Sequence, residues 1–169
     1  MKKVFLPLYA ALSCMVASAQ EGVVQIAPDW QFWSATDKIT DMTRGFARAQ
    51  SGNGGILIVK CDGTGDNEIY AQFIFDKFIG SGAQPSRPIT YRADGGTPQI
   101  VAAMEDKNYA AIFSTSFARF ANDIASAKKL VVRATTFEGE DVDAELRING
   151  AAIAIHAVAQ ACGTKSPVN

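Results

Sequence analysis

The chain has 169 residues, 16 basic and 17 acidic side chains, and a formal charge of −1. This length is enough for a single domain with a real hydrophobic core. Acidic and basic residues are interspersed, with no basic block that could follow a phosphate backbone, so the composition argues against nucleic-acid binding. Beyond the N-terminal region no apolar run reaches about 18 residues, so no membrane span is expected in the mature protein.

The N-terminus has the features of a cleavable secretory signal. Lys2 and Lys3 form a short positive region, and residues 4–16 follow without a charge. This apolar run is too short to span a bilayer. Small residues then precede the position between Ala19 and Gln20, where the A-x-A rule predicts cleavage. We therefore expect a protein that is periplasmic or secreted.

Signal cleavage would leave residues 20–169 as one β-rich domain, with a loose tail from about residue 163. The sequence has no internal repeat, low-complexity tract or linker before that tail. A rival cleavage site at Cys14 would instead give a lipid-anchored protein, although Leu12 stands where a small or β-branched residue is usual.

Two cysteines, Cys61 and Cys162, remain after signal cleavage. In an oxidising compartment two remaining cysteines are most simply disulfide partners. The alternative is a redox or catalytic thiol, but neither cysteine lies in a C-x-x-C motif. The sequence therefore predicts a structural disulfide that closes a loop of about 100 residues.

Short strand patterns separated by turn residues dominate the chain. The expected strands cover residues 29–36, 55–60, 69–75, 88–92, 98–103, 109–114, 130–135 and 142–148. The Ile/Leu/Val run at 55–60 is typical of a strand buried on both faces. Residues Asp94, Gly95 and Gly96 predict a hairpin turn.

Helical spacing of apolar residues appears at residues 116–127 and again at 150–161, where Asn149 is the expected N-cap. The predicted fold class is therefore β-rich α+β. We expect a curved antiparallel sheet or sandwich with one or two packed helices, including a C-terminal helix.

Residues that could carry chemistry are few. The chain's one histidine, His156, lies among alanines in the expected last helix, where a packing role is more usual than catalysis. One histidine and two bridged cysteines cannot build a closed zinc site. Oxygen ligands at alternating positions of segment 62–68 could hold calcium, but two glycines there are more economically a hairpin turn. No metal or cofactor is therefore expected.

Acid pairs offer a hydrolase alternative. Glu105 with Asp106, or the acids between Glu138 and Asp143, could serve as a glycosidase couple if a cleft brought them together. As acids in expected loops or on strand edges they are more often solvated. The sequence therefore assigns no catalytic residue.

Aromatic and arginine side chains are the candidates for partner contact, because these residues dominate interface hot spots. The candidates are Trp30, Trp33, Tyr91 and Arg92. The alternative is that the tryptophans close the core of a small β domain.

Several short motifs occur in an order that resembles the VasI/TagO family. They are a Trp-rich first strand, ILIVKCDGTGDNE at 56–68, ITYRADG at 89–95, LVVR at 130–133, and the stretch 144–162 that ends in AxxxAC. Members of that family are exported proteins of Gram-negative bacteria associated with type VI secretion loci. The resemblance implies a non-enzymatic envelope accessory and supplies no catalytic residue to transfer.

The sequence thus leads to one main hypothesis, a non-enzymatic periplasmic accessory or binding protein. Its expected partner is another envelope protein or a cell-wall component. The alternatives are a prophage-borne exported protein that acts on the host envelope, and a periplasmic cell-wall hydrolase or inhibitor. A buried acid pair in a deep cleft would favour the enzyme, whereas a shallow apolar patch would favour the binding protein.

Overall fold

A computed structural model describes residues 22–50, 55–61, 68–80 and 86–168. These residues form strands β1 (Val24–Ala27), β2 (Trp30–Thr36), β3 (Thr43–Gln50), β4 (Ile56–Cys61), β5 (Ile69–Ile74), β6 (Arg87–Ala93), β7 (Gln99–Asp106), β8 (Tyr109–Ile112), β9 (Lys129–Thr135) and β10 (Asp141–Arg147). They also form helices α1 (Ser114–Ile124) and α2 (Ala151–Ala161).

The ten strands make one antiparallel sheet in the order β1-β2-β3-β4-β5-β8-β7-β6-β9-β10. Strands β1 to β5 follow one another as neighbours, and β5 then pairs with β8, with Ala71 opposite Ile112. The β6–β7 hairpin turns at Asp94 and Gly95, whose φ angles of 45° and 73° lie in the left-handed region that such turns require. The predicted hairpin is therefore confirmed.

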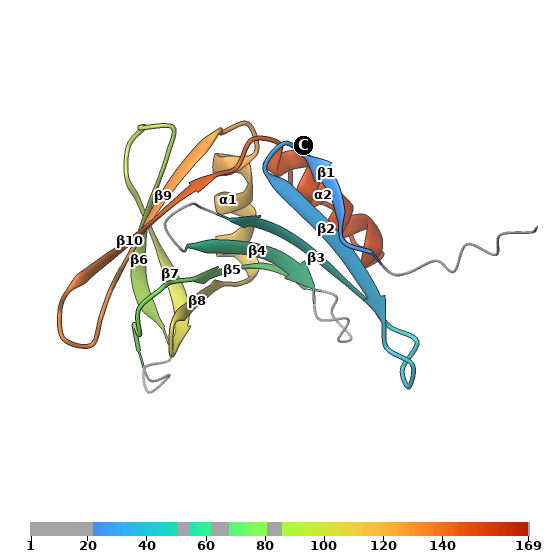
Figure 1. Cartoon of the computed structure of the whole chain (residues 1–169), viewed down its shortest axis with the longest axis horizontal. Helices are drawn as coiled ribbons and strands as arrows, with labels where there is room; N and C mark the ends of the chain where they lie inside the picture. Colours follow the sequence, from blue (N-terminus) through green and yellow to red (C-terminus); the bar gives the residue numbers. More distant parts are fainter. Residues whose placement is uncertain (1–21, 51–54, 62–67, 81–85, 169) are drawn as a thin grey trace, which may run out of the picture.

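The sheet is strongly curved, so its two end regions approach each other (Figure 1). Strand β10 lies close to β3 and β4, far from it in the strand order. The indole Nε1 of Trp30 donates a hydrogen bond of 3.1 Å to the carbonyl oxygen of Ile148, just after β10. The backbone N–H of Asn149 donates to the Asp29 carboxylate at 3.0 Å. These contacts tie the β1–β2 turn to the end of β10.

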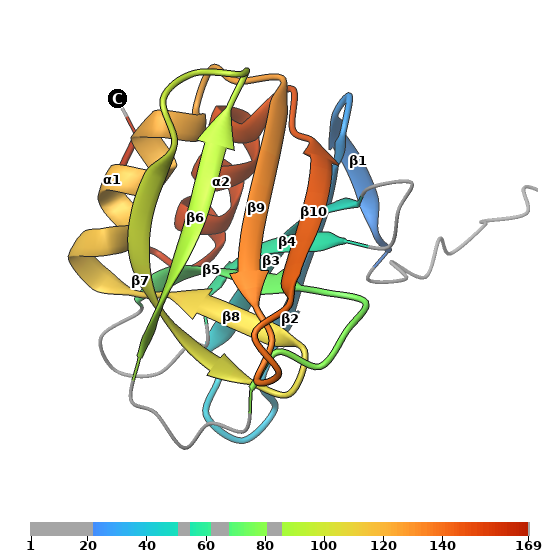
Figure 2. The same ribbon diagram turned by 90° about the vertical axis from the view of Figure 1, so that its left-hand side faces the viewer.

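Both helices lie on the same side of the sheet, which we call the inner face. Figure 2 shows them behind β6, β7 and β9. The Phe120 ring of α1 lies edge-on to Phe73 of β5 and Tyr91 of β6, with centroids 5.6 Å and 5.0 Å apart. Helix α1 therefore packs against both halves of the curved sheet, while α2 packs against β1 to β4. The opposite side is the outer face.

The predicted fold class is confirmed: the structure is a β-rich curved antiparallel sheet with two helices, one of them C-terminal. The sequence patterns missed β1 and β3, which flank the predicted strand β2 on either side near one end of the sheet. The prediction that residues 55–60 are buried on both faces is wrong, because Ile56, Ile58 and Lys60 point outward and are only half-buried.

The predicted capping role of Asn149 is also wrong. Gly150 occupies the N-cap of α2 with φ 93°, and no side chain caps that end. Residues 163–168 follow the helix; Val168 is buried, and the Asn122 amide donates 2.9 Å to the Pro167 carbonyl. Among the residues that the structure describes, no helix is both long and apolar enough to cross a membrane.

Candidate functional site

Cys61 and Cys162 are joined by a disulfide, as predicted. Cys61 ends β4 and Cys162 follows α2, and their Cα atoms are 6.5 Å apart across a sequence separation of 101 residues. The disulfide fixes the C-terminal end of α2 to the middle of the sheet's first half. A bond in this position consumes both thiols, so Cys61 and Cys162 serve structure.

The two tryptophans lie in different environments. Trp30 is fully buried and packs in the core, where its indole bonds Ile148. Trp33 lies on the outer face and is half-buried. Its ring stacks on Phe46 of β3, with centroids 5.1 Å apart and planes within 7°. Of the pair, Trp33 is the one whose side chain a partner could contact.

Trp33 begins a row of outward side chains across four strands, which we call the aromatic row. Strand pairing places Trp33 opposite Phe46, Phe46 opposite Lys60, and Lys60 opposite Tyr70. The Lys60 ammonium lies 5.0 Å from the centre of the Tyr70 ring, and Tyr70 stacks on Phe113. The aromatic row could not be predicted from the sequence, because Phe46 lies on β3 and the sequence patterns did not predict that strand.

A polar hollow of about 200 Å³ lies beside the aromatic row, at the end of the sheet. It is lined mainly by Gln25, Asp29, Gln31, Arg48, Gln50 and Arg147. Arg48 donates to the Gln31 side-chain oxygen at 2.7 Å, and the Arg147 Nε lies 3.6 Å from Asp29. The hollow therefore presents amides and guanidinium groups close together, and the residues come from β1, β2, β3 and the end of β10.

Tyr91 and Arg92 are neighbours in β6 and point to opposite faces. Tyr91 is buried on the inner face, and its hydroxyl donates 2.6 Å to Asp123 at the end of α1. Burial, together with the Asp123 carboxylate, raises the pKa of Tyr91 well above its ordinary range. Arg92 is exposed on the outer face. Arg92 is thus the more accessible of these two predicted contact residues.

Arg92 lines a shallow hollow of about 270 Å³ over β6, β9 and β10, together with Val131 and Glu145. In the same hollow Arg133 makes a two-pronged contact with Asp143, with both N···O distances 2.7 Å. Bonding to Arg133 holds the pKa of Asp143 below its ordinary value. Among the described residues Arg92 has no ion-pair partner, so its charge is available to an incoming group.

An apolar strip borders this hollow on β7. It consists of the outward side chains Ile100, Ala102 and Met104, and Ile100 and Met104 are 70% and 53% exposed. Ile100 pairs with Thr90, and Thr90 pairs with Arg133, so the strip continues directly into the charged rows. No helix covers this part of the outer face (Figure 2). The apolar strip and the hollow that it borders thus form a shallow surface on which apolar and charged side chains lie side by side.

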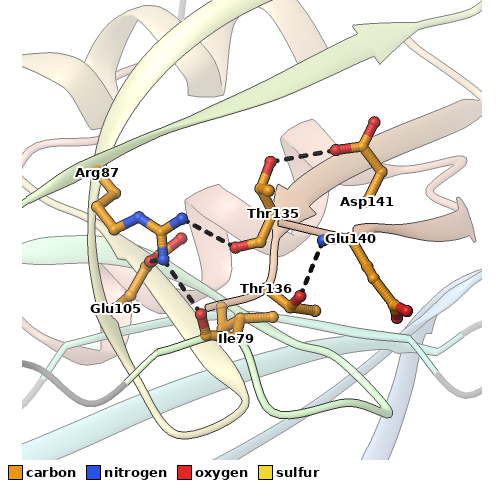
Figure 3. A network of polar contacts seen from close by, with 7 residues as sticks. All are labelled: Ile79, Arg87, Glu105, Thr135, Thr136, Glu140 and Asp141. Carbon is orange, nitrogen blue, oxygen red and sulfur yellow. Dashed lines mark hydrogen bonds and ion pairs between the residues drawn. The ribbon is translucent and has the colours of Figure 1, made fainter. Parts of the chain in front are cut away.

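A buried ion pair lies on the inner side of the same strands (Figure 3). The Arg87 Nη1 atom is 2.9 Å from Oε2 of Glu105, whose side chain is 4% exposed. Arg87 also donates to the carbonyls of Ile79 at 3.2 Å and Thr135 at 3.1 Å. Burial raises the pKa of Glu105, and the adjacent guanidinium opposes that rise. The pair ties three chain segments together.

This pair was missed because the predicted strand stopped at residue 103. Had the alternation been continued to Glu105, that residue would have fallen in phase with Ala103, on the buried side. The two-residue period of the strand could therefore have predicted that Glu105 is buried.

The carboxylate pairs proposed for a hydrolase are not brought together in a cleft. Glu105 is buried beside Arg87, whereas its neighbour Asp106 accepts a hydrogen bond of 3.2 Å from Tyr109. Glu138 and Asp143 are both exposed, one in the β9–β10 turn and one on β10.

Two further candidates from the sequence lie elsewhere. His156 is on the exposed side of α2. Segment 62–67, the calcium or hairpin candidate, lies outside the described residues. Within the residues described, no group of three or more His, Cys, Asp or Glu side chains could hold a metal ion.

No family model, curated protein or solved structure matches the chain.

Proposed function

We propose that the protein is a non-enzymatic accessory protein of the bacterial envelope that binds a partner protein through the outer face of β7, β6, β9 and β10. The observation that carries this proposal is the apolar strip, in which Ile100 and Met104 remain exposed and Ile100 lies diagonally next to Arg92 of β6. Isolated exposed apolar residues are common on protein surfaces. Here they lie on the same face of the sheet as Arg92 of the neighbouring strand, a cation that has no ion-pair partner among the described residues.

The chemistry of this face defines the partner. An apolar segment that covers Ile100 and Met104 would remove their surface from water, and a carboxylate beside it would pair with Arg92. Arginine flanked by apolar side chains is typical of interface hot spots. We infer a protein partner that carries an apolar segment next to an acidic side chain.

The disulfide and the N-terminal pattern support an exported location. A disulfide persists in oxidising compartments, and the first nineteen residues have the pattern of a secretory signal. The resemblance to the VasI/TagO family adds an association with type VI secretion to the proposal. The partner is then a protein of the periplasm or of a secretion apparatus in the envelope.

Site-specific crosslinking tests this proposal in intact cells. A photo-reactive amino acid replaces Ile100 in one version of the protein and Ile153 in another, because Ile153 is 53% exposed on α2 and provides a matched control. We expect one discrete crosslinked product from position 100 and none from position 153. The partner protein found in that crosslinked product is then purified without the crosslink, and its binding to this protein is measured directly.

Substitutions on the face complete the test. Ile100→Asp and Arg92→Glu should each weaken binding to the purified partner at least about tenfold, while Ile153→Asp should leave it unchanged. Equal crosslinking from both positions, or unchanged binding by both face variants, would contradict the proposal.

A further inference from the structure

We propose that the outer face of β1, β2 and β3 holds a second binding site, which takes an N-acetylated glycan strand of peptidoglycan. The site combines the polar hollow with the start of the aromatic row. Its residues on β1, β2 and β3 lie on the other half of the sheet from the apolar strip on β7, and Arg147 at the end of β10 joins them where the curved sheet closes. The two sites can therefore be tested separately.

The polar hollow offers hydrogen-bond donors and acceptors together. The Gln25 amide nitrogen bonds the Ala27 carbonyl at 2.6 Å, which leaves its side-chain oxygen as an acceptor. The Gln31 oxygen accepts from Arg48, which leaves its amide nitrogen as a donor. Neither remaining atom has a hydrogen bond to another described residue. A sugar hydroxyl both donates and accepts, and an acetamido group does the same through its N–H and C=O.

The charges in the hollow distinguish a glycan from a simple anion. Asp29 lies 3.6 Å from the Arg147 Nε and holds its carboxylate in the lining, where it weakens the attraction of the hollow for a multiply charged anion such as phosphate. Two guanidinium groups against one carboxylate still leave an excess of positive charge. That excess suits a neutral glycan strand whose attached stem peptides carry carboxylates, as in peptidoglycan.

The aromatic row supplies the second kind of contact that binds carbohydrate, which is an aromatic ring against the C–H bonds of a sugar. Trp33 follows Gln31 by two residues on the same face of β2, about 7 Å further along the strand. Strand pairing places Gln31 opposite Arg48 and Trp33 opposite Phe46, so polar and aromatic pairs are adjacent on one surface. The C–H bonds on one side of a pyranose ring are attracted to the negative face of an aromatic ring. One sugar in the hollow thus places the next beside Trp33.

Co-sedimentation with purified, insoluble peptidoglycan tests the proposal on the oxidised exported protein. Cellulose is the control polymer because it has no acetamido or carboxylate groups. We expect the wild-type protein to sediment with peptidoglycan and not with cellulose. Arg147→Gln and Trp33→Ala should each weaken binding about tenfold.

The variants separate binding from folding and from the partner face. The Arg147 side chain is 80% exposed, so Arg147→Gln tests the site even if Trp33→Ala unfolds the protein. Ile100→Asp is the matched control and should sediment like wild type. Equal binding of Arg147→Gln and wild type, equal binding to cellulose, or no binding to peptidoglycan would each overturn the proposal. Crosslinking from position 100 tests the partner face separately, so failure of the glycan proposal and failure of the partner proposal can be told apart.

Discussion

At the scale of single residues, the Arg87–Glu105 pair is a buried ion pair on the inner face that also bonds two backbone carbonyls. Arg87→Met removes the cation beside a buried carboxylate and breaks the bonds to the Ile79 and Thr135 carbonyls. An unpaired buried charge is strongly destabilising, so we expect a loss of about 3 kcal/mol in the free energy of unfolding. Urea denaturation at neutral pH measures it. The double variant Arg87→Met with Glu105→Gln should recover most of the loss, and a double variant as unstable as the single one would refute the charge argument.

Glu105 also predicts a pH dependence. Its pKa is raised in the folded state by burial, so the folded protein binds this proton more tightly than the unfolded chain does. The ionised carboxylate therefore costs stability at neutral pH, and that cost decreases as the pH falls through the raised pKa towards the ordinary value near 4.5. Wild type should therefore gain stability relative to Glu105→Gln as the pH falls, because Gln does not titrate. Unfolding curves of both proteins between neutral and mildly acidic pH will measure this change, and a difference independent of pH would contradict this account.

At the scale of elements, α2 is held to the sheet by a covalent bond and by close packing. Cys162→Ala opens a loop of 101 residues in sequence separation, for which the chain-entropy model gives about 4 to 5 kcal/mol. We expect a lower melting temperature than wild type under oxidising conditions and nearly equal temperatures in reductant. An equal loss in both conditions would show that the side chain matters through packing alone.

The close approach of α2 to β3 depends on Gly45. A Cβ at this position would lie 3.1 Å from the Ala161 Cβ and 3.2 Å from the Cys162 sulfur. Gly45→Val should therefore push the end of α2 away from the sheet and destabilise the protein by about 1 to 3 kcal/mol. Ala35→Val on the outward side of β2 is the control, because it adds a β-branched side chain away from the helix. Hydrogen exchange of the α2 amides measures the change, and unaltered protection would contradict it.

At the scale of the whole molecule, the predicted export can be tested together with the disulfide. Mass spectrometry of the native mature protein should show a chain that starts at Gln20, with a mass about 2 Da below the reduced form because disulfide formation removes two hydrogens. Retention of residues 1–19 would contradict the export prediction. With both surfaces in use, the protein would hold its partner protein next to the cell wall, and the loss of one surface should leave binding at the other unchanged.

The local spacing of apolar residues predicted most of the strands and helices. It failed where the residues of a strand are adapted to an element that is distant in the sequence. Alternation along 142–148 identified β10 because one face is buried and the other is wet. Strand β3 escaped prediction because its buried residues are Gly45, Ala47 and Ala49, which are small since α2 lies against them. Their low hydrophobicity reflects a helix that comes more than a hundred residues later, and no local window contains that information.

By itself the sequence determined the pattern of an export signal, the β-rich class and the pairing of Cys61 with Cys162, because composition, period and cysteine count are local or additive properties. Only the tertiary structure decided which aromatic residues face outward. Trp30 and Trp33 are three positions apart in one strand, so alternation places them on opposite faces, but only the fold shows that Trp30 is on the buried face, where its indole bonds the Ile148 carbonyl, and that Trp33 is on the outer face. The polar hollow likewise joins β1, β2 and β3 to Arg147, a contact made by the closing of the sheet.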